Sequence, residues 1–397
     1  MKTYAEAVDI ISQTVQQSKT VKIPIEKSAH YILSQDIIST ISVAPYRNSA
    51  MDGFAVAYAD IKQIPFSLPI HAVTYAGDSD QYSYKPNTAI KIMTGAPVPE
   101  GYDTVIQVEH TTFTDNKVTF HKEIKKNQNV RLPGEDIKEG DTILKAGARI
   151  NPLYIGILAS IGMTEVEVYK KPNILVLSTG NELVEPGTTL QFGQLYNSNS
   201  YTVRSMLAPF CDSITVDSIV LDERENVISA LSQDYDIIIT SGGVSAGDKD
   251  FIPEIAEQCG WVKKLHKASI KPGKPIFFAK RDNQYLFGLP GNPLSTAVTC
   301  ACFVIPAIKK IIGIKNYRIP TTPASLSKNS IIKSGRTLIW PGKIFSEDSS
   351  LVASFANKKS SAALSALLQT DGLIFQYTSN DKPTKIEITY WDEILYI

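Results

Sequence analysis

The chain alternates between apolar runs and helical patterns across residues 172–313, and this alternation restricts the folds open to it. Strands that are apolar on both faces are typical of a parallel sheet with helices packed on both sides. We therefore predict a doubly wound α/β domain, and sheets of this type bind ligands at the carboxyl ends of their strands. The strands are expected at NILVLS, SITVDSIVLDE, YDIIITS, PIFFAK and YLFGLP, and the helices at NSYTVRSMLAPF, RENVISALSQ, PEIAEQCG and PLSTAVTCACFVIPAIKKIIG.

Different patterns flank this domain. Val8, Ile11 and Val15 recur at the spacing of an amphipathic helix near the N-terminus, and a second helical apolar face covers residues 155–161. Residues 45–137 between them are predicted to form short strands separated by turn residues. One interpretation is that the two helices pack together and enclose this β segment as an insertion. The last part of the chain returns to short strands.

Charge and composition exclude several classes of protein. Lys plus Arg and Asp plus Glu both number 40, so nothing global favours nucleic acid or an anionic membrane, and any anion site must be local. No apolar run approaches the ~20 residues of a membrane span, and the N-terminus lacks the apolar core of a signal peptide. The cysteines form no CxxC pair, the histidines are scattered, and Cys300 and Cys302 are expected to be packing residues. We expect a cytoplasmic, multidomain protein.

Three loops that follow predicted strands share one composition. They are LSTGNELVEPG (177–187), TSGGVSAGDKD (240–250) and GLPGNPLS (288–295). Each combines glycine, which lets the backbone approach a ligand, with hydroxyl or amide side chains. One such loop alone is an ordinary tight turn, but three at one sheet edge predict a shared phosphate-binding site. The chain contains neither GxxxxGK[ST] nor a GxGxxG in the first strand–helix turn, so the site is of another kind.

Charged residues accompany these loops. The acids just past predicted strand ends are Glu182, Asp222, Asp248 and Asp250. Carboxylates would repel a bound anion unless a hard cation such as Mg²⁺ bridges the two, and the alternative is that they are solvated loop acids. The stretch HKASIKPGKPIFF supplies the opposing charge through Lys267, Lys271 and Lys274, directly before a buried strand. A role against phosphate or an oxyanion is expected for these lysines.

Two further stretches lie in the β segment. NSAMDGFAV contains Asp52, and KIMTGAPVPEG contains Thr94. Each is a turn in isolation, to which physical reasoning alone assigns no function. In chain order, however, SAMDGFAV, IMTGAPVPEG, LSTGNELVEPG, SGGVSAGDKD, IKPGKP and GLPGNP together resemble the MoeA-type molybdenum insertase family, the molybdopterin molybdenumtransferases. The six stretches cover residues 49–293, and in this combination they are highly specific.

The resemblance implies a multidomain α/β plus β fold in four parts. These are a discontinuous helical subdomain (1–44 and 138–171), an inserted β subdomain (45–137), a molybdopterin-binding α/β domain (172–316) and a C-terminal β-barrel (317–397). It also implies a homodimer whose active cleft is shared between protomers, with a molybdopterin adenylyltransferase as a further partner. The implied reaction inserts molybdate into adenylylated molybdopterin with Mg²⁺ as cofactor, and releases AMP and molybdenum cofactor.

The resemblance also implies roles for individual residues. The catalytic residues would be Asp52, Thr94, Glu182, Asp222, Asp250, Lys267 and Lys271, of which Glu182, Asp222 and Asp250 would bind the metal. Because the cleft is shared, Asp52 and Thr94 would act on the α/β domain of the partner. The remaining contacts to the molybdopterin substrate would come from Thr179, Gly180, Ser241, Gly242, Gly243, Ser245, Gly247, Lys274, Pro290, Gly291, Asn292 and Ser361.

The sequence departs from the family pattern in two places. Asn181 stands where the family often has Asp, which bears on how many carboxylates reach the metal. The stretch KSSA at 359–362 replaces the family's frequent QGSG, and within it Ser361 keeps the hydroxyl that would contact molybdate. Arg336 is a further candidate for a contact from the C-terminal domain.

Two other functions compete with the transferase. An adenylyltransferase or nucleotide pyrophosphatase would use the same α/β domain, although a lone domain of that kind would not need the segment that contains SAMDGFAV. A non-catalytic scaffold would use the architecture for dimerisation and partner binding, although the acids Asp52, Glu182, Asp222 and Asp250 are all intact.

Overall fold

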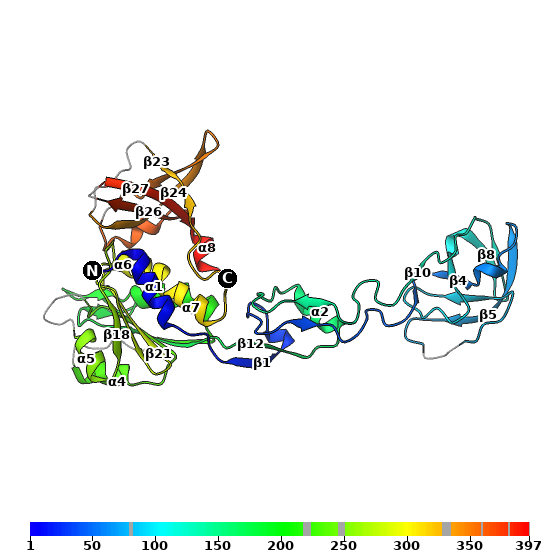
Figure 1. The fold of residues 1–397 in the computed structure, drawn as a ribbon, viewed down its shortest axis with the longest axis horizontal. Coiled ribbons are helices and arrows are strands. Elements are labelled where there is room, and N and C mark those ends of the chain that lie inside the picture. The colour runs from blue at the N-terminus through cyan, green and yellow to red at the C-terminus, as the bar shows by residue number, and fades with distance from the viewer. Residues whose placement is uncertain are drawn as a thin grey trace. The chain divides into compact units, whose positions relative to one another are not determined.

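The computed structural model describes residues 1–78, 82–216, 224–244, 251–327, 335–358, 360–379 and 382–396. The chain forms two compact units (Figure 1). The larger unit contains Met1–Gln35, Ala146–Pro152 and Glu165–Ile397, and the smaller unit contains Asp36–Lys145 and Leu153–Thr164.

A six-stranded sheet forms the centre of the larger unit, in the order β16-β13-β17-β21-β20-β18. Its strands are β13 (Asn173–Ser178), β16 (Ser213–Val216), β17 (Ile237–Ser241), β18 (Val262–His266), β20 (Phe277–Arg281) and β21 (Gln284–Leu289). The first four strands in this order are parallel, as predicted. The prediction is wrong for β20, which is antiparallel to both of its neighbours. A two-residue turn joins β20 to β21, and a parallel pair would need a long crossover instead.

Helices cover both faces of this sheet because its strands are apolar on both sides. Ile174 and Val176 of β13 face a core shared with α1 (Tyr4–Thr14), α3 (Asn199–Leu207), α6 (Pro293–Thr299) and α7 (Ile305–Ile311). Leu175 and Leu177 face the opposite core, shared with α4 (Arg224–Leu231) and α5 (Ile252–Gln258) (Figure 1). This alternation, which has the period of a strand, confirms the doubly wound α/β class.

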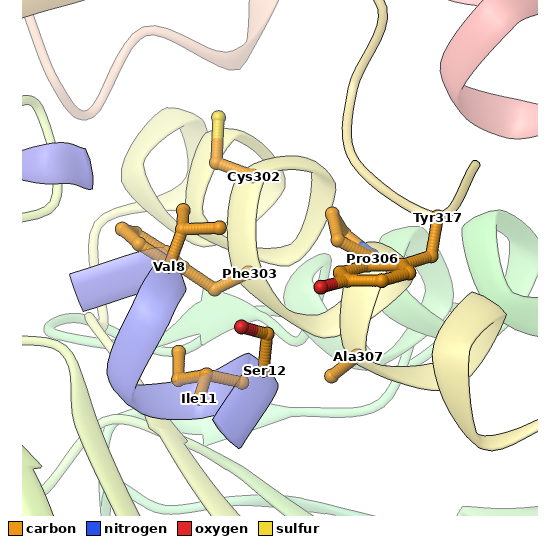
Figure 2. Close-up of a pocket in the computed structure, with 8 residues that line it drawn as sticks. All are labelled: Val8, Ile11, Ser12, Cys302, Phe303, Pro306, Ala307 and Tyr317. Carbon is orange, nitrogen blue, oxygen red and sulfur yellow. The ribbon is translucent and has the colours of Figure 1, made fainter. Parts of the chain in front are cut away.

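The N-terminal helix α1 belongs to the α/β core. A capping box between Thr3 and Glu6 begins the helix, and its face of Ala7, Ile11 and Val15 packs into the larger core cluster. Helix α1 packs against β18 and α7, within the same unit. The residual gap beneath α1 is small (Figure 2). It holds about 10 Å³, the room of a single water molecule, and is a packing gap rather than a ligand site.

A continuous helix, Pro293–Ile311, runs through the same core as α6, a π-helical turn at Cys300–Val304, and α7. Contrary to expectation, it is long and apolar enough for a membrane span by length and composition alone. However, 94% of its apolar window is buried inside the protein, as in a core helix. Burial raises the pKa of both the Cys300 and Cys302 thiols, which supports the prediction that these cysteines pack rather than react.

The C-terminal part of the larger unit is a seven-stranded sheet. Its strands are β19 (Ile270–Lys271), β22 (Thr322–Pro323), β23 (Ser325–Leu326), β24 (Thr337–Glu347), β25 (Ser350–Phe355), β26 (Gly372–Ser379) and β27 (Lys382–Tyr390), followed by α8 (Trp391–Leu395). The short segment that holds β22 and β23 pairs with β27 at one end and with β25 at the other, so the sheet curls back on itself. Strand β19 comes from the α/β domain and pairs in parallel with β24. The larger unit also contains the pairs β1 (Thr20–Pro24) with β12 (Glu165–Tyr169), and β14 (Leu183–Val184) with β15 (Leu195–Tyr196).

The smaller unit is built on a six-stranded sheet in the order β7-β4-β6-β5-β9-β8. Its strands are β4 (Gly53–Val56), β5 (Phe66–Thr74), β6 (Ala89–Ile92), β7 (Thr104–Gln107), β8 (Thr111–Thr114) and β9 (Lys117–Phe120). Phe54 and Val56 face one apolar cluster and Ala55 faces another, so this sheet is also buried on two sides. The unit also contains β2 (Ile37–Ile38), β3 (Asn48–Ser49), β10 (Val130–Arg131), β11 (Thr142–Leu144) and α2 (Tyr154–Ser160).

Gly53 tests the packing of this sheet. A Cβ at this position would lie 1.9 Å from the Ile106 carbonyl oxygen, so Gly53→Ala must push β4 away from β7. We expect a loss of at least about 1–3 kcal/mol in the free energy of unfolding, measured by urea denaturation. Gly156→Ala is the matched control, because a Cβ there meets nothing and alanine favours the helix by about 0.5–1 kcal/mol. Equal unfolding midpoints for the two variants would contradict the packing described for β4.

Candidate functional site

The three glycine-containing loops meet at one edge of the α/β sheet. Ser178, Ser241 and Leu289 are register partners on the adjacent parallel strands β13, β17 and β21, so the three loops begin at the same level. The loops are also bonded to one another: the N–H of Thr179 donates to the Ser241 carbonyl at 3.1 Å, and that of Gly242 donates to the Leu289 carbonyl at 3.0 Å. The structure therefore confirms the prediction that the three loops meet at the carboxyl ends of the strands.

Gly242 and Gly243 form the tightest part of this edge. Both have positive φ values, 100° and 69°, and a Cβ on Gly242 would lie 2.7 Å from the Thr179 hydroxyl. The buried Thr179 hydroxyl has no hydrogen-bond partner within the described ranges. The N–H of Gly242 is already bonded to Leu289, so this glycine offers close backbone approach to a ligand rather than a free donor.

Two asparagines tie the loops together, and sequence reasoning missed both. Asn199, the first residue of α3, donates from Nδ2 to the Ser241 hydroxyl and to the Gly291 carbonyl, both at 2.8 Å. Asn197 is buried; its Oδ1 accepts from the Ser178 hydroxyl at 2.9 Å. The amides within NSNS were the only available signal, but asparagine is common in loops and nothing local names its partners.

The third loop contacts the C-terminal domain through Ser361. The Asn292 Nδ2 donates to the Ser361 hydroxyl at 3.1 Å, and the Leu294 N–H donates to the Ser361 carbonyl at 3.1 Å. The Pro290 carbonyl accepts from the Thr296 hydroxyl at 2.6 Å, which holds the loop to the start of α6. Ser361 therefore lies against the glycine loop, although its sequence context differs from the family pattern.

The predicted lysines lie on the segment between β18 and β20, in which Lys271 is the last residue of the short strand β19. Lys267 and Lys271 are half-buried and Lys274 is exposed. The loop packs on α6, since a Cβ at Gly273 would lie 2.3 Å from a methyl group of Thr299. Arg336 donates to the carbonyl of Ile270 at 3.1 Å, so this candidate arginine contacts the backbone next to Lys271.

Only one of the three predicted metal ligands can be placed. The side chain of Glu182 is exposed and folds back over Gly180, where a Cβ would lie 2.6 Å from its Oε1. Asp222 and Asp250 lie outside the described residues, as do Ser245, Gly247, Asp248 and Lys359. Among the residues that are described, no group of three His, Cys, Asp or Glu side chains is placed to hold a metal. The Glu182 carboxylate nevertheless fits Mg²⁺, which often binds one or two carboxylates together with substrate phosphates.

Asp52 and Thr94 are bonded to each other in the smaller unit. Asp52 Oδ1 accepts from the Thr94 N–H at 2.7 Å and from its hydroxyl at 2.8 Å. The backbone hydrogen bond first, and the hydroxyl second, hold the pKa of Asp52 below its usual value. Asp52 is thus an exposed, ionised carboxylate held in a fixed direction.

Comparisons with known proteins agree with this arrangement. Residues 2–162 match the family described as "MoeA N-terminal region (domain I and II)", and residues 175–310 match "Probable molybdopterin binding domain". The molybdopterin molybdenumtransferase of Haemophilus influenzae is 41% identical over 316 residues, which are 78% of this chain and 78% of that protein. The protein of the same name from Staphylococcus epidermidis is 32% identical over 372 residues, 88% of each chain.

Solved structures give the same result for the fold. A molybdopterin biosynthesis MoeA protein from Pyrococcus horikoshii aligns with a TM-score of 0.82 and 26% identity, over 98% of both chains. A second crystal structure from that organism aligns with a TM-score of 0.74 and 25% identity, over 98% of this chain and 100% of the other.

The sheet edge and the chain's multidomain build define a protein of the α/β plus β class, whose central domain matches the family described as a probable molybdopterin binding domain. The matches over both the N-terminal and the α/β regions make the assignment more specific. The chain belongs to the MoeA family, the molybdopterin molybdenumtransferases of molybdenum cofactor biosynthesis.

Thr94→Val tests the geometry around Asp52. The variant removes the hydroxyl donor and keeps the backbone donor, so the pKa of Asp52 should rise toward the ordinary value of 3.8, as followed by NMR titration of the carboxyl carbon. Because the folded pKa is lowered, the stabilisation is present above the unfolded pKa and is lost as pH falls through the folded one. As the pH is lowered, the variant should therefore lose the stabilisation from ionised Asp52 at a higher pH than the wild type does, within the range below pH 3.8.

Thr88→Val is the control, since the Thr88 hydroxyl bonds to Lys85 and Tyr102 in the same unit and does not contact Asp52. An Asp52 titration that is identical in Thr94→Val and wild type would disprove the hydroxyl bond.

Proposed function

We propose that this chain inserts molybdate into adenylylated molybdopterin and releases AMP and molybdenum cofactor. The observation that carries the proposal is the meeting of three glycine loops at the carboxyl edge of the parallel sheet, in a chain of this family. Phosphorylated ligands bind at such edges, where backbone and hydroxyl groups can approach closely. The loop residues Thr179, Gly180, Ser241, Gly242, Gly243, Pro290, Gly291 and Asn292 are proposed to hold the pterin phosphate or the pyrophosphate, together with Ser245 and Gly247.

The lysine loop is proposed to neutralise charge. Lys267 and Lys271 are half-buried at the base of their loop, where an ammonium group is less screened than on the surface. They would stabilise the charge that develops as the adenylyl bond breaks, and Lys274 would contact the substrate from the exposed part of the loop. Ser361 lies against Asn292 and is proposed as a contact to molybdate.

Mg²⁺ is proposed as the cofactor, held by Glu182, Asp222 and Asp250. When bound, it would supply positive charge to the phosphate groups of the substrate. The Glu182 carboxylate is the one of these three ligands whose position is described, and its side chain is exposed.

The wider assembly is also part of the proposal. We place the protein in the cytoplasm as a homodimer with a shared active cleft, to which Asp52 and Thr94 contribute the bonded pair described above. A molybdopterin adenylyltransferase is proposed as the partner that supplies the substrate. The four domains are proposed at 1–44 with 138–171, 45–137, 172–316 and 317–397, except that α1 packs with the α/β domain.

AMP release from adenylylated molybdopterin tests the proposal. With Mg²⁺ present, the wild type should release AMP in a molybdate-dependent manner, and Glu182→Gln and Asp250→Ala should lose at least about a hundredfold in rate. Lys62→Ala, in the smaller unit, is a control that should keep the wild-type rate. Release that ignores molybdate would point to a pyrophosphatase, and the absence of release would leave a binding protein.

A further inference from the structure

Asn199 bonds to two of the three loops without belonging to any of them. Its amide nitrogen carries two hydrogens, and both are used: one for the Ser241 hydroxyl and one for the Gly291 carbonyl, each at 2.8 Å. Ser241 ends β17, and Gly291 follows the end of β21. A single side chain therefore bridges the loops that follow two neighbouring strands.

The direction of these hydrogen bonds requires an amide. The Gly291 carbonyl can only accept, so its partner must donate. The Ser241 hydroxyl also approaches the Pro290 carbonyl at 3.5 Å, where it acts as the donor, so it must accept from Asn199. A carboxylate of the same shape has no hydrogen to give to either group, and its oxygens would face the Gly291 carbonyl directly.

The backbone that carries Asn199 is itself held to the first strand. Asn197 Oδ1 accepts from the Ser178 hydroxyl at 2.9 Å and from the Ser200 N–H at 3.3 Å, while its Nδ2 donates to Glu185 at 3.1 Å. Ser178 is the last residue of β13. The segment 197–200 thus connects the ends of all three strands, and Asn199 is the part of it that reaches the second and third loops.

We propose that Asn199 is a positioning residue, which sets the spacing between the backbone of Gly242–Gly243 and that of Gly291–Asn292. This inference rests on the proposed function, in which those two loops hold the phosphate groups of adenylylated molybdopterin. Asn199 acts through Ser241 and Gly291 and does not itself contact the reacting atoms. Loops that are misplaced by a fraction of an ångström bind the substrate less well and orient it less well.

Asn199→Asp tests the inference because it keeps the shape of the side chain and removes both donors. We expect KM for adenylylated molybdopterin to rise and kcat/KM to fall roughly tenfold to a hundredfold, with little change in Tm. Asn199→Ala should lose activity similarly, without introducing a negative charge near the substrate. Thr202→Val is the matched control on the same helix, since the Thr202 hydroxyl donates to the Ser198 carbonyl within its own turn.

Hydrogen exchange gives a second readout that does not depend on activity. The N–H groups of Gly242 and Leu294 are bonded across the loops, to Leu289 and Ser361. In Asn199→Asp their protection should fall roughly tenfold, while amides inside β17 keep wild-type exchange. A loss of protection that is equal throughout the sheet would overturn the inference, because it would mean that Asn199 only stabilises the fold.

The two experiments separate the possible failures. If the wild type releases no AMP, the proposed function fails, and the exchange measurement alone decides whether Asn199 sets the loop spacing. If the wild type is active and Asn199→Asp matches it in KM, kcat/KM and exchange, the inference fails and the proposed function stands.

Discussion

The parallel pairing of β13, β17 and β21 is the constraint on which the rest of the larger unit depends. Parallel strands end on the same side of a sheet, so their loops must share one edge. The helices that return the chain must then cover both faces, which explains why the central strands are apolar on both sides. Burial of these two cores makes the edge rigid, and a rigid edge is what allows a few hydrogen bonds among loops to define a site.

Much of this fold could be predicted from the sequence because strand burial and helix periodicity are local signals. NILVLS and YDIIITS identify their strands through continuous apolar residues, without knowledge of any partner. The direction of PIFFAK could not be predicted in the same way, since it depends on a two-residue turn whose length is visible only once both strand ends are known. The packing of α1 depended on a nonlocal choice between two apolar partners, which the pattern of Val8, Ile11 and Val15 leaves open.

The candidate site also contains residues with a local sequence signal and residues without one. The glycine loops and the lysine segment could be recognised as candidate ligand-binding segments from their local composition. The structure places these segments around the α/β sheet. Asn199 gives no such signal, because its two acceptors lie 42 and 92 residues away along the chain. The interaction between Asp52 and Thr94 also spans 42 residues, and only a resemblance to known sequences linked these residues to a function. Side chains whose hydrogen-bond partners lie far away in the sequence are thus the least predictable part of the site.

Strand β19 has a consequence for how this architecture can change. Lys271 lies on a strand of the C-terminal sheet, paired with Leu338 of β24, although it arises within the α/β domain. The two domains therefore share backbone hydrogen bonds at a proposed substrate contact, and the Ser361 hydroxyl reinforces the connection. Genetic exchange that replaced one domain with that of a distant relative would leave a sheet edge unpaired beside a proposed active-site lysine. The α/β domain and the C-terminal sheet of this chain therefore depend on each other for a completed sheet edge, and a replacement for either would have to supply the same strand pairing.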